Sequence, residues 1–440
     1  MKPQFLISSI GPGNGKTIFA MGLIHALRKR GMKVQPYKCG PEITDTQLLT
    51  LSADNEAVNL DEWITTYTHI QHTYNKYGEK ADACIIEGNG ALFDGYKRMQ
   101  GSSAEIAKLL NVPVVLLVNA RMAGYSIASI IYGFKHFHPQ VKIVGVVFNQ
   151  ITSSAHYSYL KEACFDAGVD CLGYLPYNAE FKLPSKHSSI TLTTKRTMDT
   201  QINLIADDIE KNININRLLM NCNRNFPCQY TLPYSSDIEA ETVIPTSQQI
   251  KIAIARAPAF NFIYKENIAR LSIYGKITYF SPVYGSDLPE ADLIYLPGGY
   301  PELFARQLHR RHKLKNALME YAEKGGKILA ECGGMAFLGR SITAKEGGTS
   351  YEMCNILPLD FTINSKLNSG YRKMIYNGVE LRGYEFHYSA TNNAENSLIA
   401  TQATNIKGTN VDLPLYRYKN IIASYGHWYW GDKDILDLWK

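Results

Sequence analysis

The feature that most constrains the fold is an alternation of short apolar segments with amphipathic ones, which occurs twice in the 440 residues. A chain of this length exceeds one ordinary hydrophobic core, so two domains are expected. In the first half, continuous apolar strands separated by helices predict a mostly parallel, doubly wound sheet. The strands are expected at Gln4–Ser9, Lys33–Lys38, Ala83–Glu87, Val112–Val118, Val141–Asn149 and Val169–Tyr174, and helices at Thr17–Arg30, Ala104–Leu110 and Ala155–Ala167.

The second alternation begins at Ile250 and predicts another α/β domain. Before it, a helix near Thr200–Leu219 precedes a polar stretch, Asn221–Gln249, whose Asn, Ser, Thr and Pro content indicates a linker. The expected domains are therefore residues 1–220 and 250–440, joined by a linker at 221–249. In the second domain, strands are expected at Lys251–Ala255, Lys276–Phe280, Leu293–Pro297 and Lys327–Glu331, and helices at Asn261–Ile273 and Glu302–Glu323.

Composition excludes several classes of protein. The net charge of +6 is spread out, so binding of nucleic acid is not expected. No apolar run approaches the roughly 18 residues of a membrane span, and a membrane association is not expected either. The N-terminus enters a strand without a secretory leader, and the eight cysteines are scattered without C-x-x-C spacing, so we expect a cytoplasmic protein without structural zinc.

A glycine loop follows the first expected strand, with the sequence I-G-P-G-N-G-K-T at residues 10–17. Backbone amides in such a loop, a lysine and a threonine hydroxyl together bind a nucleotide triphosphate with its magnesium. The usual pattern has glycine six residues before the lysine, where Ile10 stands here, so this is a deviant P-loop. A glycine-rich turn with a chance G-K-T is the alternative, and the position after a strand disfavours it. The residues expected to bind the nucleotide are Gly13, Asn14, Gly15, Lys16 and Thr17.

A magnesium site needs carboxylates near this loop. Glu87 ends an apolar strand, Asp45 follows the strand that ends at Lys38, and Asp94 lies in a glycine-flanked segment. Each could instead be a solvated loop carboxylate. We expect all three to have a role at the metal or the phosphates.

A cysteine stands at the end of a strand in the second half, in the sequence E-C-G-G at residues 331–334. A nucleophile between a strand and a helix, followed by two glycines, is the layout of a nucleophile elbow. Such a helix N-terminus is expected to lower the pKa of the Cys332 thiol, with backbone amides available for an oxyanion. A second glycine turn, residues 296–302, is expected to face the same atom. The alternative is a buried cysteine before a glycine turn.

A thiol nucleophile needs a base, and the second half offers two histidines. They are His387, in G-Y-E-F-H-Y-S, and His427, in A-S-Y-G-H-W. Spacing alone does not choose between them.

Motifs spread along almost the whole chain, from Phe5 to Gly431, give a family resemblance. Taken in this order, they resemble the cobyrinic acid a,c-diamide synthases, which join a dethiobiotin-synthetase-like ATP domain to a class I-type glutamine amidotransferase domain. The motifs are V-Q-P-Y-K-C-G-P at 34–41, E-G-N-G-A-L-F-D-G at 87–95, G-Y-L-P at 173–176, L-P-S-K-H at 183–187, L-P-G-G-Y-P-E at 296–302, E-C-G-G at 331–334 and L-R-G-Y-E-F-H-Y-S at 381–389.

The resemblance implies a fold and a chemistry. The fold is α/β with two domains: a deviant P-loop, doubly wound, mostly parallel sheet, then a class I glutamine amidotransferase-like α/β domain. ATP would phosphorylate the a and c acetate carboxylates of the corrinoid cobyrinic acid, and ammonia from glutamine would displace each phosphate, in cobalamin biosynthesis. ATP and Mg²⁺ are the cofactors implied.

The resemblance also assigns roles to residues. Cys332 would form a glutamyl thioester, assisted by His427, because the family's histidine lies in its last S-Y-x-H segment. His387 would then be structural or lie near the site. Magnesium would be bound by Thr17, Asp45 and Glu87, the nucleotide or a corrinoid carboxylate would lie near Asp94, and adenine would be recognised by Asn149.

The sequence departs from the family at several positions, and these departures leave Lys16, Thr17, Glu87, Cys332 and His427 in place, so an active enzyme is expected. The alternatives are amidation of a related tetrapyrrole (hydrogenobyrinic acid or a nickel sirohydrochlorin), cobyric acid synthase, and a non-catalytic, MinD-like ATP switch. The oligomeric state is not fixed by the sequence, and a homo-oligomer is allowed. The departures are Ser9 for glycine, Glu42 and Asn119 for aspartate, Tyr384 for histidine, and Tyr429 where many class I enzymes have glutamate.

Overall fold

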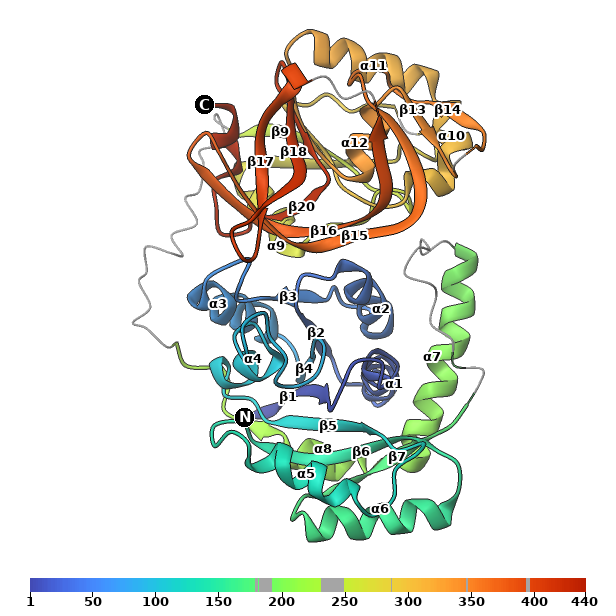
Figure 1. Ribbon diagram of the computed structural model, residues 1–440, viewed down its shortest axis with the longest axis vertical. Coiled ribbons are helices and arrows are strands. Elements are labelled where there is room, and N and C mark those ends of the chain that lie inside the picture. Colours follow the sequence, from blue (N-terminus) through green and yellow to red (C-terminus); the bar gives the residue numbers. More distant parts are fainter. Residues whose placement is uncertain (179–180, 182–191, 231–248, 286, 346, 393–395) are drawn as a thin grey trace. The chain divides into compact units, whose positions relative to one another are not determined.

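The computed structural model describes residues 1–178, 181, 192–230, 249–285, 287–345, 347–392 and 396–440 (Figure 1). These residues form two compact units, the first containing the described residues up to 230 and the second those from 249 onward. Most of the expected linker, and the L-P-S-K-H motif at 183–187, lie outside the described residues. Among the described residues, no helix is long and apolar enough to cross a membrane.

The first unit is built on an eight-stranded sheet in the order β3-β2-β4-β1-β5-β6-β7, with β8 antiparallel to β1. All pairs from β3 to β7 are parallel. This confirms the doubly wound, mostly parallel sheet. The strands are β1 (Lys2–Ser9), β2 (Val34–Cys39), β3 (Val58–Leu60), β4 (Ala83–Glu87), β5 (Val114–Asn119), β6 (Ile143–Ile151), β7 (Cys171–Pro176) and β8 (Asn223–Arg224).

Helices cover both faces of this sheet (Figure 1). Helix α1 packs against α2 and α7, whereas α3 to α6 share one hydrophobic core on the other face. At the carboxyl ends of β1, β2 and β4, the chain leaves the sheet at a common edge, which is where ligands bind in such folds. The helices are α1 (Lys16–Lys29), α2 (Ile43–Ala53), α3 (Tyr67–Gly78), α4 (Ser103–Leu109), α5 (Ile127–His136), α6 (Ser154–Asp166), α7 (Leu192–Asn212) and α8 (Ile215–Asn221).

The helix expected at Thr200–Leu219 is wrong in one respect, because it is divided into α7 and α8. The backbone at Ile213 forms a bridge with Gly173 of β7, and the amide of Asn214 donates to the carbonyl of Leu172 at 2.8 Å. The Asn214 side chain then caps α8 by accepting from the amide of Arg217 at 3.0 Å. Pairing with the sheet edge therefore interrupts the helix.

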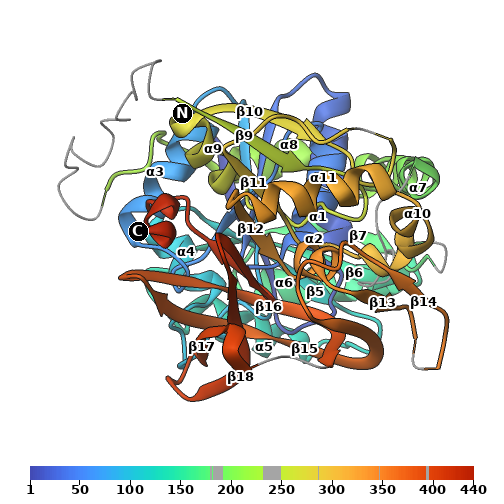
Figure 2. The same ribbon diagram turned by 90° about the horizontal axis from the view of Figure 1, so that it is seen from above.

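The second unit contains a twelve-stranded mixed sheet in the order β10-β9-β11-β12-β19-β18-β17-β15-β13-β14, and β16 pairs with both β15 and β20. Figure 2 shows the neighbouring strands β10, β9, β11 and β12 of this sheet. The pairs from β10 to β19 are parallel, and the following strands are mainly antiparallel. The strands are β9 (Ile250–Ala255), β10 (Gly275–Phe280), β11 (Leu293–Leu296), β12 (Lys327–Glu331), β13 (Ser341–Thr343), β14 (Ser350–Glu352), β15 (Asp360–Tyr376), β16 (Val379–Asn392), β17 (Ile399–Asn405), β18 (Asn410–Tyr418), β19 (Ile421–Ser424) and β20 (Gly426–Tyr429).

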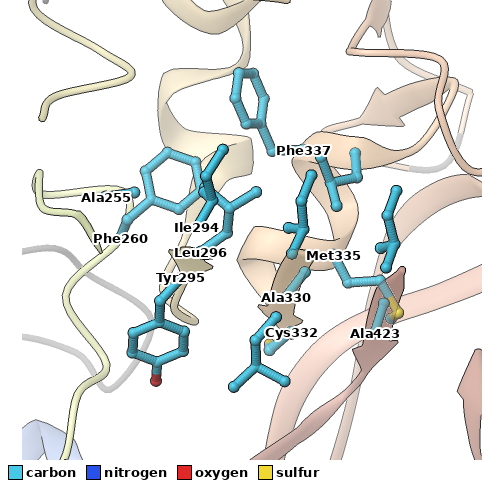
Figure 3. Close-up of a cluster of buried hydrophobic side chains, with 14 of the residues drawn as sticks. Ala255, Phe260, Ile294, Tyr295, Leu296, Ala330, Cys332, Met335, Phe337 and Ala423 are labelled. Atoms are coloured by element: carbon cyan, nitrogen blue, oxygen red, sulfur yellow. The ribbon is translucent and has the colours of Figure 1, made fainter. Parts of the chain in front are cut away.

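The core of this unit gathers around its parallel strands. Figure 3 shows a part of it, in which Phe260, Tyr295 and Met335 are almost fully buried. Burial of each such large apolar side chain stabilises the unit by about 1.5–3 kcal/mol. The helices are α9 (Lys265–Tyr274), α10 (Ala305–His309), α11 (His312–Glu323) and α12 (Gly333–Leu338), with short 3-10 turns η3 (Pro301–Phe304), η4 (Asn396–Leu398) and η5 (Ile435–Trp439).

The helix expected at Glu302–Glu323 is divided into η3, α10 and α11, so its continuity is also wrong. Leu308 and Leu314 are both buried in the same core. In one straight helix, side chains six positions apart point about 120° away from each other. The turn at Arg310 and Arg311 lets both leucines face the sheet.

Candidate active site

The loop between β1 and α1 has the geometry of a phosphate-binding turn. Gly13 and Gly15 have φ values of 72° and 89°, which favour glycine. A Cβ on Gly15 would lie 2.3 Å from Nδ2 of Asn149, so a side chain is excluded there. Helix α1 begins at the next residue, and its free amides face the carboxyl edge of the sheet, where an anion is stabilised.

Lys16 is held across this loop. Its Nζ donates to the carbonyl oxygen of Gly90 at 2.6 Å and to Oγ of Ser9 at 3.0 Å. Burial and the nearby charge of Lys38 lower the pKa of Lys16. Ser9, which departs from the family's glycine, therefore supplies a contact to the lysine.

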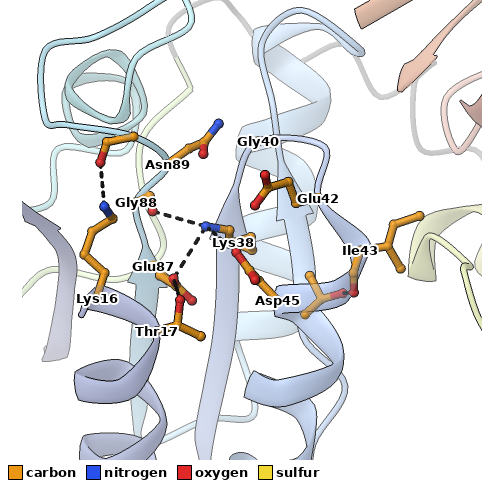
Figure 4. Close-up of polar contacts among 12 residues, drawn as sticks. Lys16, Thr17, Lys38, Gly40, Glu42, Ile43, Asp45, Glu87, Gly88 and Asn89 are labelled. Atoms are coloured by element: carbon orange, nitrogen blue, oxygen red, sulfur yellow. Dashed lines mark hydrogen bonds and ion pairs between the residues drawn. The ribbon is translucent and has the colours of Figure 1, made fainter. Parts of the chain in front are cut away.

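A buried lysine joins the two carboxylates expected at the metal site (Figure 4). Nζ of Lys38 lies 3.1 Å from Oδ2 of Asp45 and 3.5 Å from Oε1 of Glu87, and it donates to the carbonyl of Gly88 at 3.2 Å. Burial disfavours its charge, but Glu87, Asp45 and Glu42 outweigh that effect and raise the pKa of Lys38. The sequence did not indicate this role, because it depends on the pairing of β2 with β4, which puts Lys38 and Glu87 in register.

The residues around Glu87 fit a magnesium ion. The hydroxyl of Thr17 donates to Oε1 of Glu87 at 2.6 Å, while Oε2 is buried without a hydrogen-bond partner among the described residues. Burial raises the pKa of Glu87 to about 7, although Lys38 opposes the shift. One or two carboxylates, a hydroxyl and phosphate oxygens form the ligand set that Mg²⁺ prefers. Within the described ranges, no group of three His, Cys, Asp or Glu side chains could hold a metal alone, so phosphates would complete the shell.

The two remaining expected residues lie in different settings. Asn149 contacts the loop directly, because its Nδ2 donates to the carbonyl of Asn14 at 2.8 Å and its Oδ1 accepts from the amide of Gln150 at 2.9 Å. Asp94 is exposed in the loop after β4. No hydrogen bond or ion pair between described residues joins its carboxylate to Glu87 or Lys38. The geometry therefore gathers Thr17, Asp45 and Glu87, but not Asp94.

In the second unit, Cys332 occupies a strained elbow. Its φ of 44° and ψ of −104° are unfavourable for a residue with a side chain, and strain of this kind is concentrated at functional sites. Its amide donates to the carbonyl of Ser424 at 2.7 Å, which fixes the end of β12. A Cβ on Gly334 would lie 2.0 Å from the carbonyl oxygen of Leu296. Because Gly333 and Gly334 have no side chains, the backbone after Cys332 can lie directly against the turn at 296–299. This confirms the expectation that the two glycine turns face each other.

The Cys332 side chain lies on the wall of a small pocket in this unit. Burial, and then the nearby carboxylate of Glu302, raise the pKa of the thiol. The expectation of a lowered thiol pKa was wrong, because desolvation outweighs the short helix α12. The resting thiol therefore needs a base. The pocket is lined by Gly299, Tyr300, Pro301, Glu302, Cys332, Gly333, Ala336, Ile342, Phe361, Ile363, Phe386, His387, Tyr388 and Ser389.

His427 lies beside the elbow. A Cβ on Gly298 would be 2.1 Å from Cε1 of His427 and 3.3 Å from Cβ of Cys332, so the ring and the nucleophile are close neighbours. Both ring nitrogens are buried, and among the described residues neither has a hydrogen-bond partner of normal geometry, although the Phe386 carbonyl lies near. Burial and then His387 lower the pKa of His427 to about 4. A neutral imidazole with uncommitted nitrogens can act as a base.

His387, by contrast, is fully engaged. Its Nδ1 lies 2.8 Å from the carbonyl oxygen of Ser389, and its Nε2 lies 2.8 Å from Oε1 of Glu385. Its ring stacks on Tyr425 with 3.7 Å between centroids. These contacts leave no ring nitrogen for the thiol and favour His427 as the base.

A P-loop unit joined to a unit with a cysteine elbow, a histidine and a glycine-lined pocket defines a nucleotide-dependent glutamine amidotransferase. Family models agree: residues 5–190 match the CobQ/CobB/MinD/ParA nucleotide binding domain, and residues 251–435 match the CobB/CobQ-like glutamine amidotransferase domain. The chain is thus a glutamine-dependent amidating ligase with a nucleotide-binding domain.

Relatives of known name match nearly the full length. The cobyrinate a,c-diamide synthase of Dehalococcoides mccartyi is 36% identical over 98% of this chain and 95% of that protein. Those of Listeria monocytogenes and Saccharolobus solfataricus are 33% and 30% identical, covering 89% and 96% of this chain and 88% and 97% of the relatives. The chain belongs to the cobyrinate a,c-diamide synthase family.

Proposed function

We propose that this enzyme amidates the a and c acetate carboxylates of cobyrinic acid in cobalamin biosynthesis, with ATP, Mg²⁺ and glutamine. The observation that carries the proposal is the match to synthases of that name over at least 89% of the chain. Two groups of residues support it, one around Lys16 and Glu87 and one around Cys332 and His427. The eight free cysteines suit the cytoplasmic location that we also propose.

In the second unit, Cys332 attacks the carboxamide carbon of glutamine. His427 takes the thiol proton and delivers it to the departing ammonia, which leaves a glutamyl thioester that water hydrolyses to glutamate. The carbonyl oxygen becomes an oxyanion in both steps. Backbone amides of Gly299 and Gly333 would stabilise it; in support, these two glycines are close neighbours, since N of Gly299 lies 3.1 Å from where a Cβ of Gly333 would be.

In the first unit, the γ-phosphate of ATP is transferred to a carboxylate of the corrinoid. Ammonia then attacks the acyl phosphate, and phosphate leaves. Lys16 and the N-terminus of α1 stabilise the phosphate charges. Magnesium would be held by Thr17, Glu87 and Asp45 and would neutralise charge on the transferring group.

Two further assignments belong to this proposal. Asn149 would recognise adenine, which requires it to exchange its present bonds to Asn14 and Gln150. Asp94, exposed after β4, would lie near the nucleotide or a corrinoid carboxylate.

The test is incubation with ATP, Mg²⁺, glutamine and a panel of tetrapyrrole acids, followed by mass spectrometry. The panel contains cobyrinic acid, hydrogenobyrinic acid and nickel sirohydrochlorin. We expect doubly amidated cobyrinic acid. If the enzyme converts another tetrapyrrole of the panel in preference, that tetrapyrrole is its substrate. Nucleotide binding without amidation of any member would favour a MinD-like switch.

A further inference from the structure

The pocket beside Cys332 is lined by two titratable side chains in addition to the Cys332 thiol and two tyrosines. Among its lining residues, Glu302 is the single carboxylate and His387 the single imidazole. The rest of the lining is apolar, hydroxylic or glycine. The charges of these two side chains therefore decide which polar ligand the pocket accepts.

Both ring nitrogens of His387 face hydrogen-bond acceptors. A neutral imidazole has one N–H, yet both ring nitrogens lie 2.8 Å from oxygens that can only accept, the Ser389 carbonyl and the Glu385 carboxylate. An imidazolium satisfies both. The face of Tyr425, parallel to the ring within 8°, is a further environment that favours a cation.

The neighbours of His387 do not cancel this charge. Glu385 is shared with Arg372, whose Nη2 lies 2.5 Å and Nε 2.6 Å from Oε2. With an imidazolium at His387, two cations share one carboxylate, and the group of Arg372, Glu385 and His387 has a net charge of +1. Glu302 contributes a negative charge elsewhere on the lining, and it acts on the Cys332 thiol electrostatically.

A negative and a positive side chain beside a nucleophile suit a ligand that has a carboxamide at one end and both an ammonium and a carboxylate group at the other. We propose that Glu302 binds the α-ammonium group of glutamine and that the imidazolium of His387 attracts its α-carboxylate. Both N–H groups of His387 are already used, so it acts through its charge rather than through a direct hydrogen bond. This inference rests on the proposed glutaminase reaction and names its specificity determinants.

The first test removes the charge of Glu302 with the isosteric variant Glu302→Gln and compares two substrates. Glutaramic acid has the carboxamide of glutamine but lacks the α-amino group. For glutamine, kcat/KM should fall about 10- to 100-fold, as expected for loss of a hydrogen bond between charged groups, mainly through KM. For glutaramic acid the fall should be much smaller. Glu320→Gln, on the exposed side of α11, is the matched control.

The second test applies the same logic to His387→Gln. Its partner substrate is 4-aminobutanamide, which lacks the α-carboxylate. For glutamine, the kcat/KM of the variant should fall below that of the wild type. For 4-aminobutanamide, kcat/KM should stay close to the wild-type value. A loss that is equal for both substrates would show a structural role and overturn the assignment of His387.

A third measurement needs no turnover. Inactivation by 6-diazo-5-oxo-L-norleucine, which carries the α-amino acid group of glutamine, should slow in Glu302→Gln, whereas alkylation of Cys332 by iodoacetamide should not. Equal effects on glutamine and glutaramic acid, or on both inactivators, would overturn the assignment of Glu302. If the wild type releases no glutamate from glutamine, the proposed function itself fails, which is a different outcome.

Discussion

The backbone amide of Trp428 donates to Oε1 of Glu331 at 3.2 Å, so the residue before Cys332 holds the residue after His427. The other carboxylate oxygen accepts from the hydroxyl of Tyr295 at 2.8 Å. One buried side chain therefore fixes the ends of β12 and β20, which present Cys332 and His427. Glu331 was not singled out from the sequence, because its partners depend on strand pairing.

The protonation of Glu331 should make stability depend on pH. Burial raises its pKa from 4.5 to about 8, so the folded state holds a proton that the unfolded state has lost between these values. Stability from this group is present below pH 4.5 and is lost as the pH rises toward 8. Glu331→Gln cannot titrate. Its Tm relative to wild type should therefore rise with pH across this window, and a difference in Tm that does not change with pH would contradict the account.

Cys332→Ala should abolish synthesis that depends on glutamine and leave synthesis from free ammonia largely intact. The reason is that the thiol only releases ammonia, while the first unit uses it. The measurement is product formation with each nitrogen source, with folding checked by thermal melt. A folded variant that has lost both activities would show that the two reactions are not divided in this way.

Lys16→Ala and Glu87→Ala should lose synthesis from either nitrogen source. Each change removes charge that stabilises phosphoryl transfer or its metal, and losses on the order of a hundredfold in kcat are usual for such roles. Lys29→Ala, at the exposed end of the same helix, is the control for Lys16. Near wild-type turnover in either variant would place the nucleotide elsewhere.

Gly298→Ala should disable the glutaminase reaction through geometry alone. Its Cβ would lie 2.1 Å from Cε1 of His427, a distance that forces the ring to move. We expect a loss of about a hundredfold, because small displacements of reacting groups have effects of that size. Glutamate release is the measurement, and an unchanged rate would mean that the ring need not occupy this position during catalysis.

The sequence predicted the strands well, because apolar runs of strand length are a local signal. No expected strand end is displaced by more than two residues, and Ala83–Glu87 and Lys327–Glu331 coincide. The prediction of continuous helices was wrong at Ile213 and Arg310, because contacts with the sheet determine where those helices end. The bridge from Lys38 to Glu87 could not be predicted, because it depends on β2 lying beside β4 with these two residues in register.

His427→Ala should lower glutaminase turnover by a factor of roughly a hundred or more, the usual scale for general acid–base catalysis. The thiol, whose pKa is raised by burial, needs a base, and His427 is neutral above its lowered pKa of about 4. At saturating glutamine, His387→Ala should cost much less, since its ring nitrogens bind Ser389 and Glu385 instead. Glutamate release without corrinoid separates the two variants. A severe loss in turnover for His387→Ala with a mild one for His427→Ala would reverse the assignment.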